Sequence, residues 1–371
     1  MVTALSYVLL FNSIASLANT DTPYTLEFSP DGTKILTNSY PPQAMKELEI
    51  FDITTNSTIT NPLLSGFRAK WFPDGKKVLF DNGTGAIVID IERNEIILTK
   101  NFMKSPYVWR GEMGFVALQK ERDEEMKIVW IAYPRGLVET SVEPPYGNIS
   151  YFVYLPATDG VAFLDGMKNR KNVYIAAFNT VRQVTTTDDV ISLASIEGGK
   201  KLVWARQSKN MRYILTTLWK YDVRILAVER LPFPERIPLI NPNTRQAPSA
   251  LEQISVSPDG SRVAIVARFT SAPEPPKQPR VRKKATPQKA VQKSWVALYT
   301  MNINGTNARL IRKIEPAKAW EGFLMTWSPD SSRIAVIERL TNLTSLFLYN
   351  ADGSGKIKLK DWQKPKTPLI R

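Results

Sequence analysis

The sequence predicts an all-β fold, a β-propeller in which four-stranded blades form a ring. Three observations predict it. A strand–turn–strand pattern with Pro-Asp in its turn recurs along the chain, another pair of strands follows each copy, and successive turns are spaced as propeller blades are. We favour seven blades, with six or eight as alternatives.

The recurring turn is clearest at four places. Each copy lies between two short apolar runs, as expected of two strands joined by a tight turn. Proline presets φ at the first central position, and glycine takes the left-handed conformation that ends the turn. The four copies are residues 29–32, 72–75, 257–260 and 328–331. In the last copy Ser331 replaces glycine, which we expect to cost a little stability.

Weaker copies fill the gaps between these four. The seven turns are centred near residues 31, 74, 112, 159, 198, 259 and 330. A second strand pair follows the first, for example at 295–314 and 345–360, so each unit has four strands. One such sheet cannot bury both faces, but a ring of stacked sheets can. We therefore assign residues 24–362 to a single propeller domain.

The four Pro-Asp turns, together with the turns at 302–305 and 350–355, resemble the TolB-like propeller repeat. This WD-like repeat also occurs in tricorn protease and in the propellers of prolyl oligopeptidase-type enzymes. The resemblance covers about residues 24–362 and implies the fold. Its residues build turns, so it implies no catalytic residue. The chain has no Gly-x-Ser-x-Gly motif, so we expect no catalytic domain beside the propeller.

The two end blades, near residues 24–60 and 324–360, each appear with four strands of their own. We therefore expect the first blade to pack against the last without a strand from residues 4–11. We also expect Trp71, Trp109 and Trp327, at equivalent positions near the end of the inner strand, to be buried between neighbouring blades.

Residues 3–18 form an apolar stretch that is too short to span a bilayer, which needs about 20 residues. With a small-x-small site at residues 16–18, it predicts a signal peptide over residues 1–18. We therefore favour an extracytoplasmic protein, periplasmic, secreted or envelope-associated, with no transmembrane span. Because no Lys or Arg precedes the stretch, two alternatives are an apolar strand packed on the first blade and a remnant of a longer anchor. A cytoplasmic location is the alternative to export.

The 371 residues include no cysteine and no histidine. Disulfides, thiolate nucleophiles, Ser-His-Asp triads and histidine-ligated metals are therefore excluded. Few enzyme mechanisms survive both absences. We expect a monomer that is not an enzyme and has no cofactor or metal.

The net charge of +14 comes mainly from two short stretches, residues 274–293 and 356–371. Residues 271–293 are rich in proline and lysine and lack aromatic residues, which predicts a disordered insertion within a blade. Residues 363–371 form a basic C-terminal tail. The candidate residues for an anionic partner are Arg280, Arg282, Lys283, Lys284, Lys289 and Lys293. Because no aromatic residues alternate with these charges, sequence-specific binding of nucleic acid is not expected.

These observations leave three hypotheses about function. The main one is a non-catalytic scaffold or protein-binding module of the cell envelope, with an unidentified protein partner. The second is an electrostatic tether to an anionic membrane surface or polyanion through the basic insertion and tail. The third is a carboxylate-based hydrolase or lyase at the mouth of the axial channel. A pair of Asp or Glu side chains there, about 5–10 Å apart, would favour it.

Overall fold

The structure is a computed structural model. It describes residues 25–38, 47–120, 125–167, 170–177, 179–209, 214–223, 226–231, 250–270, 294–315, 317–318, 321–341 and 343–363. The predicted signal peptide, the basic insertion and residues 364–371 of the tail lie outside these ranges. In the described part, no helix has the length and apolar character needed to cross a membrane.

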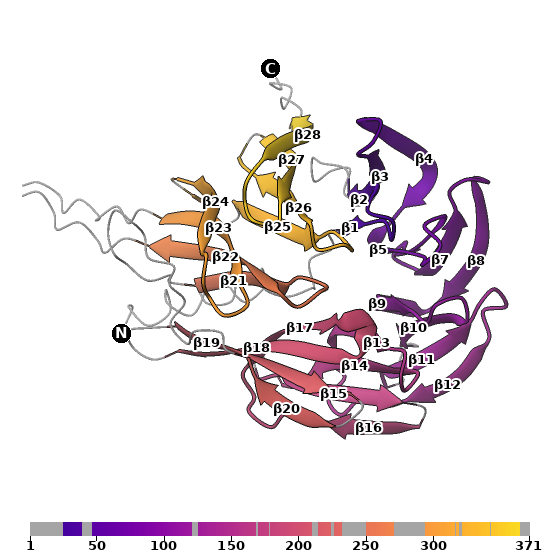
Figure 1. Ribbon diagram of the computed structural model, residues 1–371. Coiled ribbons are helices and arrows are strands. Elements are labelled where there is room, and N and C mark those ends of the chain that lie inside the picture. Colours follow the sequence, from indigo (N-terminus) through magenta and orange to yellow (C-terminus); the bar gives the residue numbers. More distant parts are fainter. Residues whose placement is uncertain are drawn as a thin grey trace, which may run out of the picture.

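Seven four-stranded antiparallel sheets form a ring, so the prediction of a seven-bladed propeller is confirmed (Figure 1). Each blade takes four strands that are consecutive in the chain, and the first of them lies innermost. The strands of blades 1 to 4 are β1(Leu26–Phe28), β2(Lys34–Asn38), β3(Glu47–Asp52) and β4(Ser57–Ser65), then β5(Phe67–Trp71), β6(Lys77–Asp81), β7(Gly85–Asp90) and β8(Glu95–Asn101), then β9(Met103–Trp109), β10(Gly114–Gln119), β11(Lys127–Ala132) and β12(Val138–Val142), then β13(Ser150–Leu155), β14(Gly160–Asp165), β15(Asn172–Ala177) and β16(Thr180–Gln183).

Blades 5 to 7 continue the same arrangement. Their strands are β17(Val190–Ile196), β18(Lys201–Lys209), β19(Ile214–Asp222) and β20(Ala227–Arg230), then β21(Ala250–Val256), β22(Arg262–Thr270), β23(Ser294–Asn302) and β24(Arg309–Ile314), then β25(Gly322–Trp327), β26(Arg333–Arg339), β27(Leu343–Asn350) and β28(Lys356–Gln363). A single 3-10 turn among the described residues, η2(Glu197–Gly199), replaces the Pro-Asp turn in blade 5. The seven predicted turns thus join the innermost strand of each blade to the second.

The Pro-Asp turns are held by their own side chains. In the last copy, the Ser328 hydroxyl donates to Asp330 Oδ1 at 2.5 Å, and the Ser332 backbone N–H donates to the same oxygen at 3.1 Å. Ser331 adopts φ 61°, close to the φ of 70° at Gly32 in the first copy. Its hydroxyl accepts a 3.1 Å hydrogen bond from the backbone N–H of Asp259 in blade 6. The serine therefore adds a contact between blades that glycine could not make.

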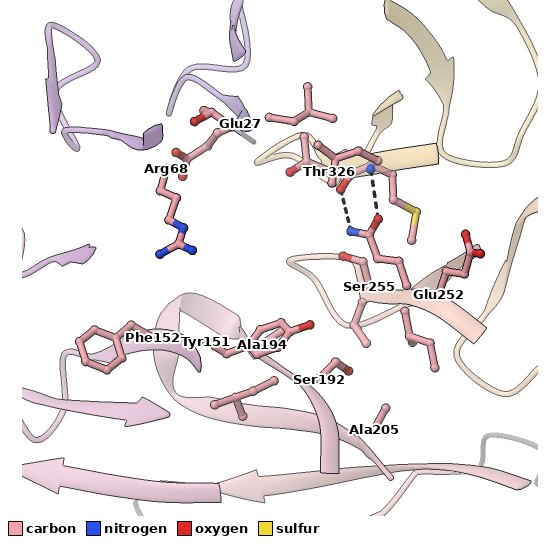
Figure 2. Close-up of a pocket in the computed structure, with 18 of the residues that line it drawn as sticks. Glu27, Arg68, Tyr151, Phe152, Ser192, Ala194, Ala205, Glu252, Ser255 and Thr326 are labelled. Carbon is pink, nitrogen blue, oxygen red and sulfur yellow. Dashed lines mark hydrogen bonds between the residues drawn. The ribbon is translucent and has the colours of Figure 1, made fainter. Parts of the chain in front are cut away.

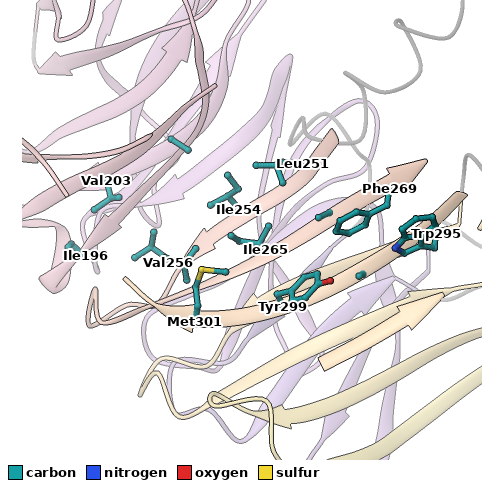
Figure 3. Close-up of a cluster of buried hydrophobic side chains, with 14 residues drawn as sticks. Ile196, Val203, Leu251, Ile254, Val256, Ile265, Phe269, Trp295, Tyr299 and Met301 are labelled. Carbon is teal, nitrogen blue, oxygen red and sulfur yellow. The ribbon is translucent and has the colours of Figure 1, made fainter. Parts of the chain in front are cut away.

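The hydrophobic core consists of seven clusters, each shared by two neighbouring blades. Figure 3 shows the cluster between blades 5 and 6. Trp71, Trp109 and Trp327 are the last residues of their innermost strands and are 5%, 7% and 7% exposed. Each belongs to a cluster between blades. The prediction that these tryptophans are buried between blades is confirmed.

The ring closes where blade 1 packs against blade 7. The four described strands of blade 7 come from residues 322–363 and those of blade 1 from residues 26–65. Residues 4–11, which we expected to contribute no strand, lie outside the described residues. One cluster combines Phe28 and Ile35 of blade 1 with Ile337 and Leu346 of blade 7. Side-chain packing thus joins the two end blades at this junction.

Candidate functional site

A cavity of about 390 Å³ lies where the seven innermost strands converge. Every one of these strands contributes lining residues: β1, β5, β9, β13, β17, β21 and β25. Figure 2 shows that the lining side chains come from opposite sides of the ring. A pocket at this position in a propeller can present chemical groups from every blade to one ligand.

In two innermost strands a register shift coincides with a left-handed residue that lines the cavity. The pairing of β5 with β6 shifts register between Phe67 and Lys70, and Arg68 within this bulge has φ 51°. The pairing of β13 with β14 shifts between Ser150 and Val153, and Tyr151 there has φ 59°. A left-handed backbone at a residue other than glycine is unfavourable, and such positions cluster at functional sites.

The close approach of β5 to β6 also requires Gly66. A Cβ at that position would lie 2.4 Å from the carbonyl oxygen of Asp81, which is part of the neighbouring strand's backbone. Figure 2 shows the guanidinium of Arg68 extending into the cavity, between the side that bears Glu27 and the side that bears Tyr151 and Phe152. The local sequence at 66–68 thus places a cation in the cavity.

Glu27 is the cavity carboxylate that is open to solvent. Its Oε1 lies 3.2 Å from the ammonium of Lys70, and its Oε2 accepts a 3.3 Å hydrogen bond from the backbone N–H of Trp71. The Glu27 side chain is 27% exposed. Burial raises the pKa of Glu27, and the Lys70 ammonium opposes this effect only in part. A carboxyl group with a raised pKa beside a cation is suited to acid–base chemistry.

Glu252, the second cavity carboxylate, is held by a buried cation. Its Oε1 accepts from Arg268 Nε, and the two side chains are 7% and 8% exposed. The Arg268 guanidinium also donates to the carbonyl oxygens of Lys318 at 3.2 Å and Glu321 at 2.9 Å. Removing one partner of such a buried pair would leave the other charge uncompensated. This network joins blade 6 to blade 7, so Glu252 has a structural role.

The remaining polar lining is suited to a hydroxylated ligand. The hydroxyl residues Ser192, Ser255 and Thr326 line the cavity. Gln253 is not available, because its amide exchanges two hydrogen bonds, of 3.1 and 3.2 Å, with the backbone of Met325 (Figure 2). Trp204 also lines the cavity, and its buried indole N–H has no hydrogen-bond partner within the described ranges.

The side chains do not form a metal centre. The chain has neither histidine nor cysteine, and the described residues contain no group of three or more carboxylates placed to hold a metal ion. The charged residues that line the cavity are Glu27, Glu252, Arg68, Lys70 and Arg339, more cations than carboxylates. This donor set favours an anion over a divalent cation.

The sequence reasoning missed these residues although a signal for them exists. Glu27, Lys70, Ser255 and Thr326 each stand two positions before the first residue of a Pro-Asp turn motif, and all four line the cavity. Side chains alternate along a strand, so this position faces the axis whereas the next residue, Trp71 or Trp327 for example, lies between blades. The predicted residues Arg280, Arg282, Lys283, Lys284, Lys289 and Lys293 lie outside the described residues.

The chain is similar in structure to other β-propellers. No family model and no curated protein match it. An oligogalacturonate lyase in complex with manganese is 14% identical, with 87% of each chain covered and a TM-score of 0.59. The oligogalacturonate lyase of Vibrio parahaemolyticus is 12% identical, with 89% of each chain covered and a TM-score of 0.60. The propeller domain of the Trilobed protease of Pyrococcus furiosus, described as having an open velcro topology, is 14% identical over 92% of this chain and 99% of that one, with a TM-score of 0.53.

At this identity the likeness establishes the fold, a seven-bladed β-propeller, and no particular family. The expectation of a non-catalytic scaffold is nevertheless wrong as the main hypothesis, because two of these similar structures are lyases. The third hypothesis, a carboxylate-based hydrolase or lyase at the channel, is better supported. The absence of histidine and cysteine does not by itself exclude an enzyme. Glutamate, lysine and arginine can perform acid–base chemistry without them.

Proposed function

We propose that the protein is a lyase whose active site is the axial cavity and whose substrate is an acidic saccharide cleaved by β-elimination. The observation that carries the proposal is the grouping of Glu27, Lys70 and Arg68 in one cavity to which all seven innermost strands contribute. The two similar lyase structures support it as an analogy of fold and reaction class.

Elimination suits the available groups better than hydrolysis does. Most glycoside hydrolases use two carboxyl groups that flank the scissile bond. Here Arg268 holds Glu252 in a buried ion pair, and Glu27 is the cavity carboxylate that a substrate can reach. An elimination transfers one proton from the carbon next to a carboxylate to the leaving oxygen and adds no water, so a single acid–base group is enough.

Each group then has a role. Arg68 and Lys70 bind the carboxylate of the sugar, and their positive charges stabilise the electron density that develops when the neighbouring C–H bond breaks. Glu27 moves the proton, for which its raised pKa is suited. The C–O bond to the leaving sugar breaks as the carbon–carbon double bond forms. Tyr151 and Phe152 offer rings on which a sugar can stack.

The experiment measures formation of the unsaturated product. The full chain is mixed with 4-linked uronic-acid oligosaccharides, and the conjugated double bond of the product is followed by its ultraviolet absorbance. We expect Glu27→Gln to abolish product formation and Arg68→Gln to raise KM. The matched control is Glu92→Gln, which changes a 62% exposed glutamate on the outside of blade 2.

Because the donor set does not fit a metal, the activity should persist in a chelator. Absence of product from every uronide tested, or full activity of Glu27→Gln, would refute the proposal.

The extracytoplasmic location and the basic tether are separate hypotheses that depend on residues outside the described ranges, and they stay predictions.

A further inference from the structure

A cluster of charged and aromatic side chains lies between blades 6 and 7, away from the axial cavity. We call it the blade 6–7 cluster and define it by Arg312 of β24, Glu338 of β26, Phe347 and Tyr349 of β27, and Lys356 of β28. Both Phe347 and Tyr349 belong to the core cluster that joins the two blades. The Arg312 guanidinium bridges the blades, with its Nε and Nη2 donating to the two oxygens of Glu338 at 2.9 and 2.8 Å.

The turn that precedes β28 lies at one edge of the blade 6–7 cluster. Gly353 in this turn lies against Ile311 and Thr300 of blade 6, so close that a Cβ there would be 3.0 and 3.2 Å from their side chains. Asp352 in the same turn pairs with Arg309 of β24 at 3.7 Å. The turn therefore holds the start of β28 against the outer part of blade 6.

Lys356 differs from its cationic neighbours in its partners. Arg309, Arg312 and Lys358 pair with Asp352, Glu338 and Asp361, respectively. Within the described part of the chain, the Lys356 ammonium makes no ion pair, and it lies 4.1 Å from the centre of the Phe347 ring. Partial desolvation of the ammonium, and then the charge of Arg312, lowers the pKa of Lys356, and the Glu338 carboxylate opposes them only in part. The charged form of a lysine in this position is destabilised by its neighbours, and a bound anion would stabilise it.

Tyr349 supplies a second donor at the same place. It is 3% exposed, and its hydroxyl has no hydrogen-bond partner among the residues described. Tyr349 and Lys356 are directly opposite each other across the pairing of β27 with β28. A buried hydroxyl that makes no hydrogen bond is unfavourable, so such groups are rare and call for an explanation.

We propose that Lys356 and Tyr349, with Arg312 beside them, bind an oxyanion: a phosphate, sulfate or carboxylate group. One such group could accept from both the ammonium and the buried hydroxyl, whereas a water molecule would leave the lysine charge uncompensated. Lys356 is itself exposed, so its flexible side chain can turn away from the Phe347 ring and admit the ligand. This site is independent of the proposed lyase activity.

The test compares binding of inorganic phosphate, sulfate and acetate by calorimetry and thermal unfolding, against chloride at equal ionic strength. Lys356→Met removes the charge but keeps the length of the side chain. Lys358→Met is the matched control, because that lysine already has a carboxylate partner. We expect at least one oxyanion to bind the wild type and Lys358→Met, and to bind Lys356→Met about tenfold more weakly, as the loss of a charge-assisted hydrogen bond implies.

Tyr349→Phe separates a binding role from a structural one. We expect it to weaken binding of the same oxyanion without lowering the unfolding temperature in chloride, because it removes a hydroxyl that has no partner. Equal binding by the wild type and Lys356→Met, absence of binding for all three probes, or a marked loss of stability of Tyr349→Phe in chloride would each overturn the proposal.

Discussion

The indole Nε1 of Trp362, in the outermost strand of the last blade, donates a 3.2 Å hydrogen bond to Glu49 Oε2 in the first blade. Lys360 forms an ion pair with the same oxygen. At the inner end of this junction, Arg333 Nη2 donates to the carbonyl oxygen of Gly32 at 3.0 Å. Among the described residues no strand crosses the junction, and these side chains and the shared hydrophobic cluster join the first blade to the last.

The first prediction concerns this junction. Glu49→Ala should lower the free energy of unfolding by about 1–3 kcal/mol, because two donors lose their common acceptor. Urea unfolding followed by tryptophan fluorescence measures the change. Glu92→Ala is the control, since its pair with Lys76 is exposed and should contribute less than about 1 kcal/mol. Equal effects of the two substitutions would show that the junction does not depend on Glu49.

The second prediction compares two equivalent tryptophans. Trp327 Nε1 donates to the carbonyl oxygen of Ser255 at 3.2 Å, whereas the buried Nε1 of Trp71 has no partner in the described part of the chain. Trp327→Phe should therefore destabilise the protein more than Trp71→Phe, by about 1 kcal/mol. Both variants lose similar apolar volume, so chemical unfolding of the pair isolates the hydrogen bond. A larger loss for Trp71→Phe would contradict this account.

The third prediction concerns acid. Hydrogen bonds from Ser328 and Ser332 lower the pKa of Asp330 from its ordinary value of 3.8 to about 2. Because the folded-state pKa is lower than the unfolded one, this aspartate stabilises the fold above pH 3.8, and the contribution is lost as the pH falls toward 2. The stability difference between wild type and Asp330→Asn should shrink over that range. Ser328→Ala, which removes the first donor, should raise the folded-state pKa of Asp330 toward 3.8, so the variant should lose less stability than the wild type over the same range.

The fourth prediction concerns the basic insertion. Thr270 and Ser294, on either side of residues 271–293, are directly opposite each other in the pairing of β22 with β23. A two-residue Asn-Gly turn can therefore replace the insertion. Because the cost of closing a loop rises slowly with its length, the free energy of unfolding should change by about 1 kcal/mol or less. A large fall in melting temperature would show that the insertion packs on the propeller.

Neutralising Arg280, Arg282, Lys283 and Lys284 together tests the same insertion for binding. If it attracts an anionic partner, the variant should bind anionic vesicles more weakly than the wild type at low salt. The difference should disappear at high salt, since the Debye length falls from about 10 Å at 0.1 M to about 3 Å at 1 M. The melting temperature should be unchanged.

Part of the candidate site could be predicted from the sequence and part could not. Side chains alternate regularly along the inner strand up to its turn, so the polar residue two positions before each Pro-Asp motif faces the axis. The repeat alone therefore predicts that Glu27 and Lys70 line the cavity. Arg68 lies two positions before Lys70 and follows the same alternation, whereas Tyr151 lies in a bulge where the alternation is interrupted. A bulge depends on the partner strand as much as on the strand that contains it.

The sequence by itself determined the propeller fold and favoured seven blades, because a tight turn between two short apolar strands is a local feature that forms within about fifteen residues. Only the tertiary structure decided which carboxylate of the cavity remains available. Glu252 is held by Arg268 from the next strand and by that guanidinium's bonds to the carbonyl oxygens of Lys318 and Glu321, whereas Glu27 keeps partial exposure beside Lys70. The carbonyl partners of Arg268 lie just before the first strand of blade 7, so this network forms only when blades 6 and 7 pack together. The physical reason is that burial and ion pairing, which determine the reactivity of a carboxyl group, are properties of its surroundings.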